Sequence, residues 1–233
     1  MAAKTVLITG STRSIGLKLA ELYIKRGWNV IGVARDLNRA DQLKSLSPYK
    51  IVQLDASDEA SIVDAAKQLE GEPIDLVINN AGIFDDLDLA SVTKDEFMRA
   101  FEVNSVGPFL VTRALLPNLR LAAANSGSAC VAQISSRLGS IGHNTSTHGG
   151  GIYSYRASKA AINMINSSLA VDLKSDSIVC VVLHPGYVAT DLNGHQGTIS
   201  TDTSVGGLVG VIDKLSIAET GKFFDYTGTE LPW

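Results

Sequence analysis

Seven short runs of apolar residues recur along the chain, separated by stretches in which apolar positions repeat every three or four residues. The runs are rich in Val, Ile and Leu and occupy 4–9, 28–34, 50–55, 74–79, 128–135, 177–184 and 222–225. Their length fits β-strands, and the stretches between them fit amphipathic helices. Strands that are apolar along their length and alternate with helices predict a parallel sheet covered on both faces. The predicted fold class is therefore α/β, a doubly wound parallel sheet of about seven strands with helices on both faces.

The length of 233 residues fits one α/β domain spanning 1–233, and no internal repeat or low-complexity linker divides the chain. In the doubly wound strand order 3-2-1-4-5-6, ligands bind in a crevice at the carboxyl ends of the strands, beside strand one. Residues that follow strands at that edge are therefore the first candidates for a functional site.

A glycine-containing turn follows the first apolar run. Residues 9–16 read Thr-Gly-Ser-Thr-Arg-Ser-Ile-Gly and lead into an amphipathic stretch from Leu17 to Arg26. Glycines at such a strand-to-helix turn let the backbone approach a pyrophosphate, which then lies at the positive end of the helix. The same turn would also fit an ordinary strand–helix connection. It indicates nucleotide binding only together with motifs further along the chain.

A tyrosine and a lysine lie four residues apart, at Tyr155 and Lys159, in a segment with helical apolar spacing. Both side chains should therefore lie on one face of one helix. A free phenol has a pKa of about 10, and a nearby ammonium favours the phenolate. Lowering the pKa of Tyr155 to about 7 would take about 4 kcal/mol, and we expect the pair to act as a general acid/base. Tyr153 is not a candidate, because Ala157 stands four residues after it.

Together these motifs resemble those of the short-chain dehydrogenase/reductase family, in its single-domain branch with a Rossmann fold. The family patterns Thr-Gly-x-x-x-Gly-x-Gly, Asn-Asn-Ala-Gly and Pro-Gly…Thr match residues 9–16, 79–82 and 185–190, and Tyr-x-x-x-Lys matches the pair above. Residues 134–141 and 230–233 are most similar to the C-factor and sniffer-like carbonyl reductases. Ser14 stands where the family has its middle glycine. We expect this serine to cap the helix and to alter the packing of the loop without loss of binding.

The resemblance implies an oxidoreductase that reduces a ketone or aldehyde by hydride transfer from a nicotinamide cofactor. Ser136 would donate a hydrogen bond to the substrate carbonyl oxygen, with Ser135 as the alternative, and Tyr155 would protonate the alkoxide. Lys159 would lower the pKa of the tyrosine and bind the nicotinamide ribose. Asn104 would bend its helix and hold a water that relays protons to the lysine.

The cofactor is expected to be NADPH, with NAD less favoured. The acidic residue that NAD enzymes usually carry at the end of strand two aligns with Ala34, and Arg35 follows it. An arginine there suits a 2′-phosphate, which it can hold by a charge-assisted, bidentate contact. Arg13 lies where NADP-preferring relatives often keep a second basic residue. The alternative is that Asp36 turns inward to the ribose while Arg35 is only surface charge.

The resemblance assigns further cofactor contacts to the turns that follow the strands. Asp55 matches the family aspartate at the adenine, Asn80 begins the turn beside the adenosine ribose, and Thr190 matches the threonine that bonds the carboxamide or pyrophosphate. The expected cofactor-binding residues are Gly10, Ser11, Thr12, Arg13, Ser14, Ile15, Gly16, Arg35, Asp55, Ala56, Asn80, Ala81, Gly82, Tyr155, Lys159, Pro185, Gly186, Val188 and Thr190.

Composition and charge narrow the partners. The chain is 45% hydrophobic and 19% charged, as in compact soluble proteins, and its net charge of −4 argues against nucleic acid. No apolar run approaches the roughly 20 residues of a membrane span, and the N-terminus runs directly into the first strand, leaving no space for a signal peptide. We therefore expect a cytoplasmic protein without a membrane partner. Cys130 and Cys180 lack metal or redox spacing, and no metal site is expected.

Two loops rich in glycine and hydroxyl residues, 142–152 and 192–204, follow strands at the predicted site edge. Loops on a rigid scaffold often determine specificity. Compared with the family, the loop between Ser136 and Tyr155 is long and the segment after Thr190 is short for a lid, which together favour an open cleft for bulky, partly apolar carbonyl compounds. His184 is expected to pack at a strand end, and His143, His148 and His195 are expected to be solvated loop side chains. The alternative is that these histidines line the site. By analogy with the family, we expect a homodimer or homotetramer. Two other functions stay open: a nucleotide-bound signalling or redox-sensing module, and alcohol oxidation as the physiological direction.

Overall fold

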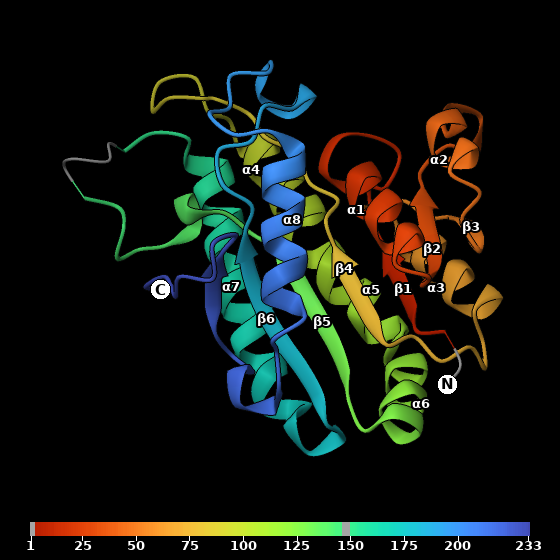
Figure 1. Ribbon diagram of the computed structural model, residues 1–233. Helices are drawn as coiled ribbons and strands as arrows, with labels where there is room; N and C mark the ends of the chain where they lie inside the picture. The colour runs from red at the N-terminus through yellow and green to blue at the C-terminus, as the bar shows by residue number, and fades with distance from the viewer. Residues whose placement is uncertain (1–2, 146–149) are drawn as a thin grey trace.

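In a computed structural model that describes residues 3–145 and 150–233, one seven-stranded sheet is flanked by helices (Figure 1). The strand order is β3-β2-β1-β4-β5-β6-β7, and every neighbouring pair is parallel. The predicted seven strands and doubly wound α/β fold are confirmed, and β7 extends the predicted order beyond strand six. The strands are Thr5–Ile8 (β1), Asn29–Ala34 (β2), Lys50–Gln53 (β3), Leu76–Asn79 (β4), Ala129–Ile134 (β5), Ile178–His184 (β6) and Phe223–Asp225 (β7).

Helices fill the connections between the strands. The α-helices are Ser14–Lys25 (α1), Asp41–Ser45 (α2), Glu59–Gln68 (α3), Lys94–Phe101 (α4), Gly107–Ala114 (α5), Leu116–Ser126 (α6), Tyr153–Asp172 (α7) and Thr201–Ile212 (α8). A π-helical segment, Glu102–Val106, joins α4 to α5. Single 3-10 turns occupy Leu37–Arg39, Arg137–Gly139, Lys174–Asp176, Asp191–Asn193 and Ile217–Glu219.

The core is divided by the sheet into two layers, which explains why the strands read as continuous apolar runs. In β1, Val6 and Ile8 pack on the face covered by α1, α2 and α8, whereas Leu7 packs on the face covered by α3, α5, α6 and α7. All three side chains are at most 1% exposed. Because both faces of the sheet are buried, apolar residues occupy both sets of alternate positions in this part of β1.

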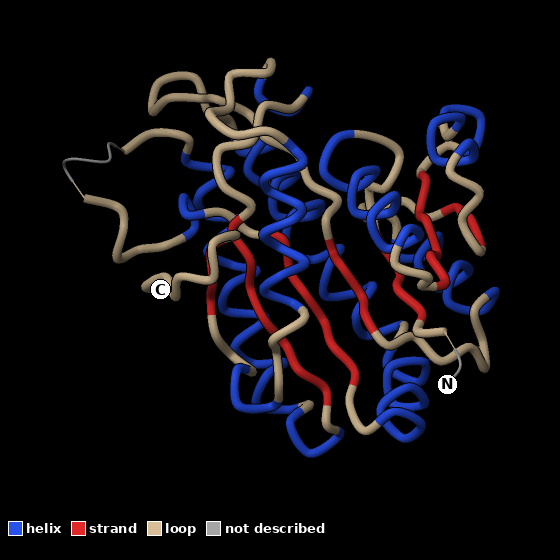
Figure 2. The backbone as a smooth tube through the Cα atoms, viewed as in Figure 1, coloured by secondary structure: helices blue, strands red, loops and turns tan. Residues whose placement is uncertain are grey.

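The carboxyl ends of the strands meet along one edge of the sheet, where loops replace strands in Figure 2. Ile8, which ends β1, is in register with Gly32 of β2 and Ile78 of β4. The motifs that follow these strands are thereby brought to a common edge. The loop predicted over 192–204 is shorter than expected, because α8 begins at Thr201. Within the described part of the chain, no helix is long and apolar enough to cross a membrane.

Candidate active site

The glycine-containing turn packs directly on the start of α1. Gly10 has a φ of 64°, a left-handed conformation that side chains disfavour. A Cβ on Gly16 would lie 2.1 Å from the carbonyl oxygen of Gly10, far inside ordinary contact distance. The first turn of α1 therefore lies against the backbone of the loop, and this helix turn contains no acidic residue. A helix N-terminus in this arrangement favours an anion.

Ser14 does not cap α1, so that expectation was wrong. The N-cap position belongs to Arg13, which makes no side-chain capping bond, and Ser14 itself has a φ of 47°. This left-handed conformation explains why glycine suits the position in the family pattern. The serine hydroxyl instead donates to Asp191 Oδ2 at 3.2 Å, on the segment that follows β6. The departure from the pattern therefore creates a contact rather than a cap.

The turn after β4 holds the glycine-containing loop in place. The side-chain amide of Asn80 donates to the carbonyl oxygens of Thr9 at 3.0 Å and of Gly10 at 3.2 Å. The backbone N–H of Ala81 donates to the Thr9 hydroxyl at 3.0 Å. Two motifs that are about 70 residues apart in the sequence are thus joined through one amide and one hydroxyl. In this structure Asn80 supports the shape of the loop.

Two of the residues expected to bind the cofactor form side-chain hydrogen bonds within the protein. The Ser11 hydroxyl is fully buried, donates to the Val33 carbonyl at 3.0 Å and accepts from the Val33 N–H at 2.8 Å. Asp55 Oδ1 accepts from the backbone N–H of Ser57 at 3.0 Å and from its hydroxyl at 2.7 Å. The Ser11 backbone N–H also donates to the Val33 carbonyl, at 3.3 Å, so Ser11 supports the loop from within, whereas Asp55 keeps its second oxygen for a ligand. Ala56 lies close to the start of α5, because a Cβ on Gly107 would be 2.3 Å from its carbonyl oxygen.

The end of β2 is basic and exposed. Ala34, which aligns with the acidic position of NAD enzymes, is buried, whereas Arg35 is exposed, as is Arg13 in the loop beside it. Within residues 3–145 and 150–233, neither guanidinium lies within 4.0 Å of a carboxylate in an ion pair. Asp36 is also exposed, and its Oδ1 accepts from the Asn38 N–H at 2.9 Å. The alternative in which Asp36 turns inward is therefore not the arrangement in this structure.

The two serines at the end of β5 point to different partners. Ser135 is buried and donates to Asn163 Oδ1 of α7 at 2.7 Å. Ser136 is 8% exposed, and its hydroxyl forms a hydrogen bond with Tyr155. It also accepts from the Leu138 N–H at 3.2 Å, which caps the 3-10 turn Arg137–Gly139. Of the two hydroxyls, that of Ser136 acts on the tyrosine, whereas that of Ser135 is bound to Asn163.

Tyr155 and Lys159 lie in the first two turns of α7, as the spacing predicted. Lys159 is 5% exposed, and its ammonium donates to the Ile134 carbonyl of β5 at 2.9 Å. Its Nζ is 5.7 Å from the centre of the Tyr155 ring. Gly139 keeps the turn after β5 close to the lysine, since a Cβ there would lie 2.8 Å from Lys159 Cβ. The ammonium is thus fixed between the end of β5 and the tyrosine.

The pKa of Tyr155 moves opposite to the sequence expectation. Burial raises it to about 12, and the hydrogen bond from Ser136 offsets only part of that rise. Burial also shifts the lysine: it lowers the pKa of Lys159 to about 8. Burial disfavours the charged form of both groups and is the largest cause of both pKa changes. The expected lowering was therefore wrong, and the phenol is protonated at neutral pH.

Asn104 lies in the π-helical segment between α4 and α5 and is 1% exposed. Its Oδ1 accepts from the Ile83 N–H at 2.8 Å, and its Nδ2 donates to the Ile83 carbonyl and to Ser158 Oγ, each at 3.0 Å. A Cβ on Gly82 would lie 3.1 Å from Asn104 Oδ1 and 3.6 Å from Lys159 Nζ. The asparagine is therefore near the lysine, in a π-bulge of the kind often found at functional sites.

The segment after β6 brings the Pro-Gly…Thr motif to the same edge. Gly186 has a φ of 86°, and a Cβ there would lie 2.5 Å from Ile199 Cδ1. Val188 is 4% exposed and pairs with Ile199 in an isolated parallel bridge. Pro185 accepts from the Ser204 hydroxyl at 2.6 Å through its carbonyl. Thr190 is 5% exposed and forms a capping box with Asn193 at the turn Asp191–Asn193.

Three residues of the site were not singled out from the sequence. The Phe84 ring meets the Tyr155 ring edge-on, with centroids 4.9 Å apart and planes at 80°. Asn163 holds Ser135, and Ser158 binds Asn104. Their positions in the sequence could have indicated that they belong to the site. Phe84 follows the Asn-Asn-Ala-Gly turn, and the other two residues lie within one turn of Lys159.

The histidines considered for the site differ in their burial and in their partners. Burial, together with Arg137 and His143, lowers the pKa of His184 to about 4, against the opposing effect of Asp225, so this imidazole is neutral. His195 Nε2 lies 3.1 Å from Asp191 Oδ1 on the segment after β6. His148 lies outside the described residues. Across the described ranges, no group of three or more His, Cys, Asp or Glu side chains is arranged to hold a metal ion.

Comparison with known sequences identifies a family. Residues 4–199 match the short chain dehydrogenase family. The C-signal of Myxococcus xanthus is 44% identical over 167 residues, which cover 69% of this chain and 93% of that protein. The 1-hydroxy-2-glutathionyl-2-methyl-3-butene dehydrogenase of Rhodococcus sp. (strain AD45) is 34% identical over 235 residues, which cover 98% of this chain and 99% of that protein.

Solved structures agree with the sequence relatives. The NADPH-bound carbonyl reductase from chicken fatty liver superimposes with a TM-score of 0.91 at 33% identity over 100% of both chains. The carbonyl reductase Sniffer of D. melanogaster superimposes with a TM-score of 0.92, also at 33% identity over 100% of both chains. With its fold, its motif positions and these relatives in agreement, the chain belongs to the short-chain dehydrogenase family of oxidoreductases.

Proposed function

We propose that the protein is an NADPH-dependent carbonyl reductase in which Tyr155 supplies the proton. The observation that carries the proposal is the position of the buried Lys159 ammonium, which lies 5.7 Å from the centre of the Tyr155 ring and donates to the Ile134 carbonyl, two residues before Ser136. This group lies at the edge of the sheet where the glycine-containing loop and α1 begin. The similarity to two solved carbonyl reductases, one of them NADPH-bound, supports the same assignment.

The site fits a dinucleotide. The close packing of Gly10 and Gly16 brings the loop backbone against the first turn of α1, which has no acidic residue of its own and favours an anion. One carboxylate, that of Asp191, lies beside that turn and accepts from the Ser14 hydroxyl. The exposed guanidinium groups of Arg13 and Arg35 suit the 2′-phosphate that distinguishes NADPH from NADH. We assign the nicotinamide end to Lys159 and Thr190. When bound, the cofactor supplies the hydride.

Each side chain then has a distinct task in carbonyl reduction. Ser136 donates a hydrogen bond to the carbonyl oxygen, where negative charge develops. Tyr155, protonated at neutral pH because its pKa is about 12, gives its proton to the alkoxide, which is the stronger base. The Lys159 ammonium stabilises the phenolate that results, because it lies 5.7 Å from the ring. Asn104 holds the backbone at Ile83, and we assign to it the relay of a proton back to the lysine.

The proposed substrate is a partly apolar carbonyl compound. Apolar side chains stand exposed on the loops at this edge of the sheet: Ile141 is 80% exposed, Tyr187 is 50% exposed and Leu192 is 43% exposed. Phe84 adds a ring against Tyr155. Apolar surface that surrounds a few placed polar groups is typical of small-molecule sites. These residues favour an aromatic or aliphatic carbonyl over a charged one.

A homodimer or homotetramer is part of the proposal. Met164 and Val171 lie seven residues apart on α7 and are 69% and 75% exposed, so they share one outward face of the helix. An apolar face on the longest helix suits a contact with a second copy of the chain. Sedimentation velocity tests the assembly, and a monomer at micromolar concentration would contradict it.

Replacing Tyr155 by Phe tests the proposed function. The Tyr155→Phe variant keeps the ring but loses the proton, so NADPH oxidation with aromatic aldehydes, quinones and diketones should fall by about 10²–10⁴-fold. NADPH binding, followed by fluorescence, should stay within about twofold. Tyr153→Phe is the matched control, since Tyr153 lies on the same turn of α7, and it should keep full activity. Similar rates for the Tyr155→Phe variant and the wild type would refute the assignment.

Two relatives favour other functions strongly enough to be tested alongside. The similarity to C-signal keeps a signalling role open, in which NADPH would bind without turnover. The relative named as a dehydrogenase keeps alcohol oxidation open as the main direction. Assays with carbonyl plus NADPH and with alcohol plus NADP⁺ separate the three, because a signalling module would be inactive in both.

A further inference from the structure

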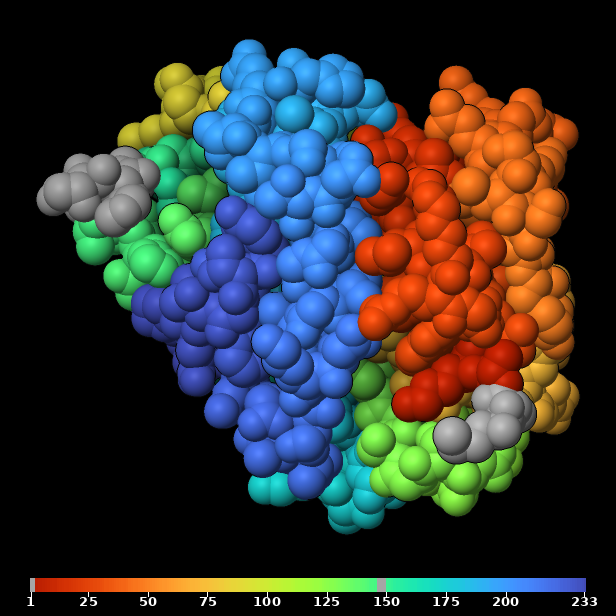
Figure 3. Space-filling model, viewed as in Figure 1, coloured from red at the N-terminus to blue at the C-terminus, as the bar shows by residue number. Residues whose placement is uncertain are grey.

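A polar seam joins α1 to the segment that follows β6. Ser14, Lys18, Leu22 and Arg26 are spaced by four residues, so they form one stripe along α1. This stripe faces α8, and the two helices lie side by side on the same face of the sheet (Figures 1 and 3). Hydrogen bonds and ion pairs occur at both ends of the stripe, with a groove of about 230 Å³ near its middle.

The first contact of the seam joins the two segments assigned to the cofactor. Ser14 belongs to the glycine-containing loop, and Asp191 directly follows Thr190. Their side chains meet at 3.2 Å, from Ser14 Oγ to Asp191 Oδ2. This bond forms although Ser14 adopts a left-handed backbone with a φ of 47°, a conformation that a non-glycine residue rarely takes. A strained residue that makes a contact between two ligand segments is a candidate for a functional role.

The segment 187–199 is closed on itself, so a contact at one point can position the whole of it. Its two ends are joined by hydrogen bonds from the Thr198 N–H to the Tyr187 carbonyl at 2.7 Å and from the Ala189 N–H to the Ile199 carbonyl at 3.0 Å. Gly186, with a φ of 86°, stands immediately before it. The Ser14 contact holds this loop against the start of α1.

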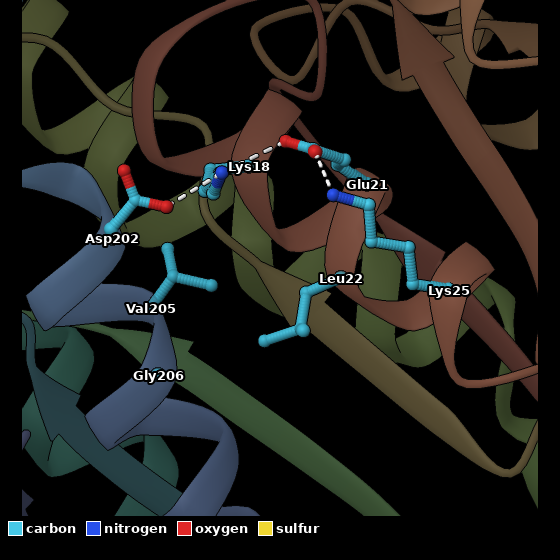
Figure 4. Close-up of a pocket in the computed structure, with 7 residues that line it drawn as sticks. All are labelled: Lys18, Glu21, Leu22, Lys25, Asp202, Val205 and Gly206. Atoms are coloured by element: carbon cyan, nitrogen blue, oxygen red, sulfur yellow. Dashed lines mark hydrogen bonds and ion pairs between the residues drawn. The ribbon is translucent and has the colours of Figure 1, made fainter.

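A second contact of the seam lies one turn further along α1. Lys18 Nζ is 2.6 Å from Asp202 Oδ1, in the first turn of α8, and 3.0 Å from Glu21 Oε2 (Figure 4). The hydrogen bond to Asp202, followed by that to Glu21, raises the pKa of Lys18, so the ammonium is charged at neutral pH. This pair fixes the other end of the loop, where α8 begins.

A third pair lies at the far end of the seam and provides a comparison. The Arg26 guanidinium binds the Asp213 carboxylate through two hydrogen bonds, of 2.6 Å and 3.2 Å. It joins the same two secondary-structure regions, but it lies after the last turns of α1 and α8, away from the loop and the glycine-containing turn. If the seam had a purely structural role, substitutions in this pair and in the other two would have the same effect on segment 187–199.

We propose that Ser14 and Asp191, supported by Lys18 and Asp202, form a latch that holds segment 187–199 closed over the cofactor and slows the release of NADPH. These are positioning residues, since they act through the loop that carries Thr190 and not on the reacting atoms. The inference rests on the proposed function for the identity of the cofactor. The latch itself is a contact within the chain, so it can be tested in the cofactor-free protein.

Hydrogen exchange in the cofactor-free protein tests the latch directly. Ser14→Ala removes the hydroxyl but keeps the Asp191–His195 pair, and Asp191→Ala removes both. Amides in 187–199 should exchange about threefold to tenfold faster in either variant, and the double variant should exchange no faster than Asp191→Ala. Arg26→Gln should leave exchange in this segment unchanged. Unchanged exchange in the Ser14→Ala and Asp191→Ala variants, or an equal increase in Arg26→Gln, overturns the latch.

The release of NADPH tests its consequence. The rate at which bound NADPH dissociates, measured by displacement in a stopped-flow instrument, should rise about threefold to tenfold in Ser14→Ala and in Lys18→Gln. It should be unchanged in Arg26→Gln. Equal dissociation rates in all variants overturn the proposed control of release. A wild type that neither binds NADPH nor reduces a carbonyl overturns the proposed function instead, while the exchange experiment still decides the latch.

Discussion

The contact between Gly16 and the loop provides a sharp test of the site's architecture. In Gly16→Ala, the added Cβ would lie 2.1 Å from the Gly10 carbonyl oxygen and 2.6 Å from Asn80 Nδ2. Ordinary carbon contacts are about 3.5–4.0 Å, so helix and loop must separate by more than about 1 Å. The Asn80 side chain can move, but the Gly10 carbonyl is backbone and is held at 3.2 Å by that same amide.

The expected cost follows from these distances. Overpacking in a close-packed region costs about 1–3 kcal/mol, and loss of the hydrogen bonds from Asn80 adds about 1 kcal/mol. We therefore expect Gly16→Ala to lower the free energy of unfolding by about 2–4 kcal/mol. For a chain of this length that corresponds to a fall in Tm of roughly 4–16 °C. NADPH binding should weaken at the same time, because the loop backbone is displaced.

Urea unfolding followed by circular dichroism measures the effect, with Gly210→Ala as the matched control. Gly210 is also helical, in α8, and a Cβ there meets nothing within 4 Å. The same chemical change should stabilise the protein by about 0.5–1 kcal/mol at that position. A free energy of unfolding for Gly16→Ala within about 0.5 kcal/mol of the wild type would refute the reasoning.

Three further predictions follow from the site. Arg35→Ala should raise KM for NADPH about tenfold without changing KM for NADH, in steady-state assays with each cofactor. Ser136→Ala should lower kcat about 10²–10³-fold with an unchanged Tm, whereas Ser135→Ala, which leaves a buried Asn163 oxygen unpaired, should instead lower the free energy of unfolding by about 1–3 kcal/mol. Burial lowers the pKa of Lys159 to about 8, so between about pH 8 and pH 10 the unfolded chain binds more protons at this lysine. The wild type should therefore gain about 2 kcal/mol relative to Lys159→Met over that range in urea unfolding, and a constant difference would contradict the buried lysine.

The strands and the motif positions were predictable from the sequence because burial on both faces leaves a strong signal. Val6, Leu7 and Ile8 are apolar in succession since they face two different helix layers. The parallel topology then brings residues after β1, β4, β5 and β6 to one edge without any knowledge of side-chain packing. Asn80, Ser136 and Thr190 were assigned to the site by their resemblance to the family motifs, and their positions after strands agree with that assignment.

Features that depend on burial and on contacts between distant residues could not be predicted from the sequence. The spacing of Tyr155 and Lys159 gave their proximity, but the direction of the tyrosine pKa depends on burial, which only the folded chain sets. The preference for Ser136 over Ser135 came from the resemblance, but the reason that Ser135 is occupied elsewhere, its bond to Asn163, appears only in the folded chain. The role of Ser14 depended on its backbone φ and on Asp191, a residue 177 positions away.

The account depends on Tyr155 keeping its proton at neutral pH, so that it has one to give. Tyrosine labelled with carbon-13 at the ring carbon that bears the hydroxyl, with the Tyr155 signal assigned by its loss in Tyr155→Phe, reports ionisation directly by NMR. With a pKa of about 12, the Tyr155 signal should stay constant from about pH 6 to pH 10 in the cofactor-free protein. A signal that titrates near pH 7 would contradict the account.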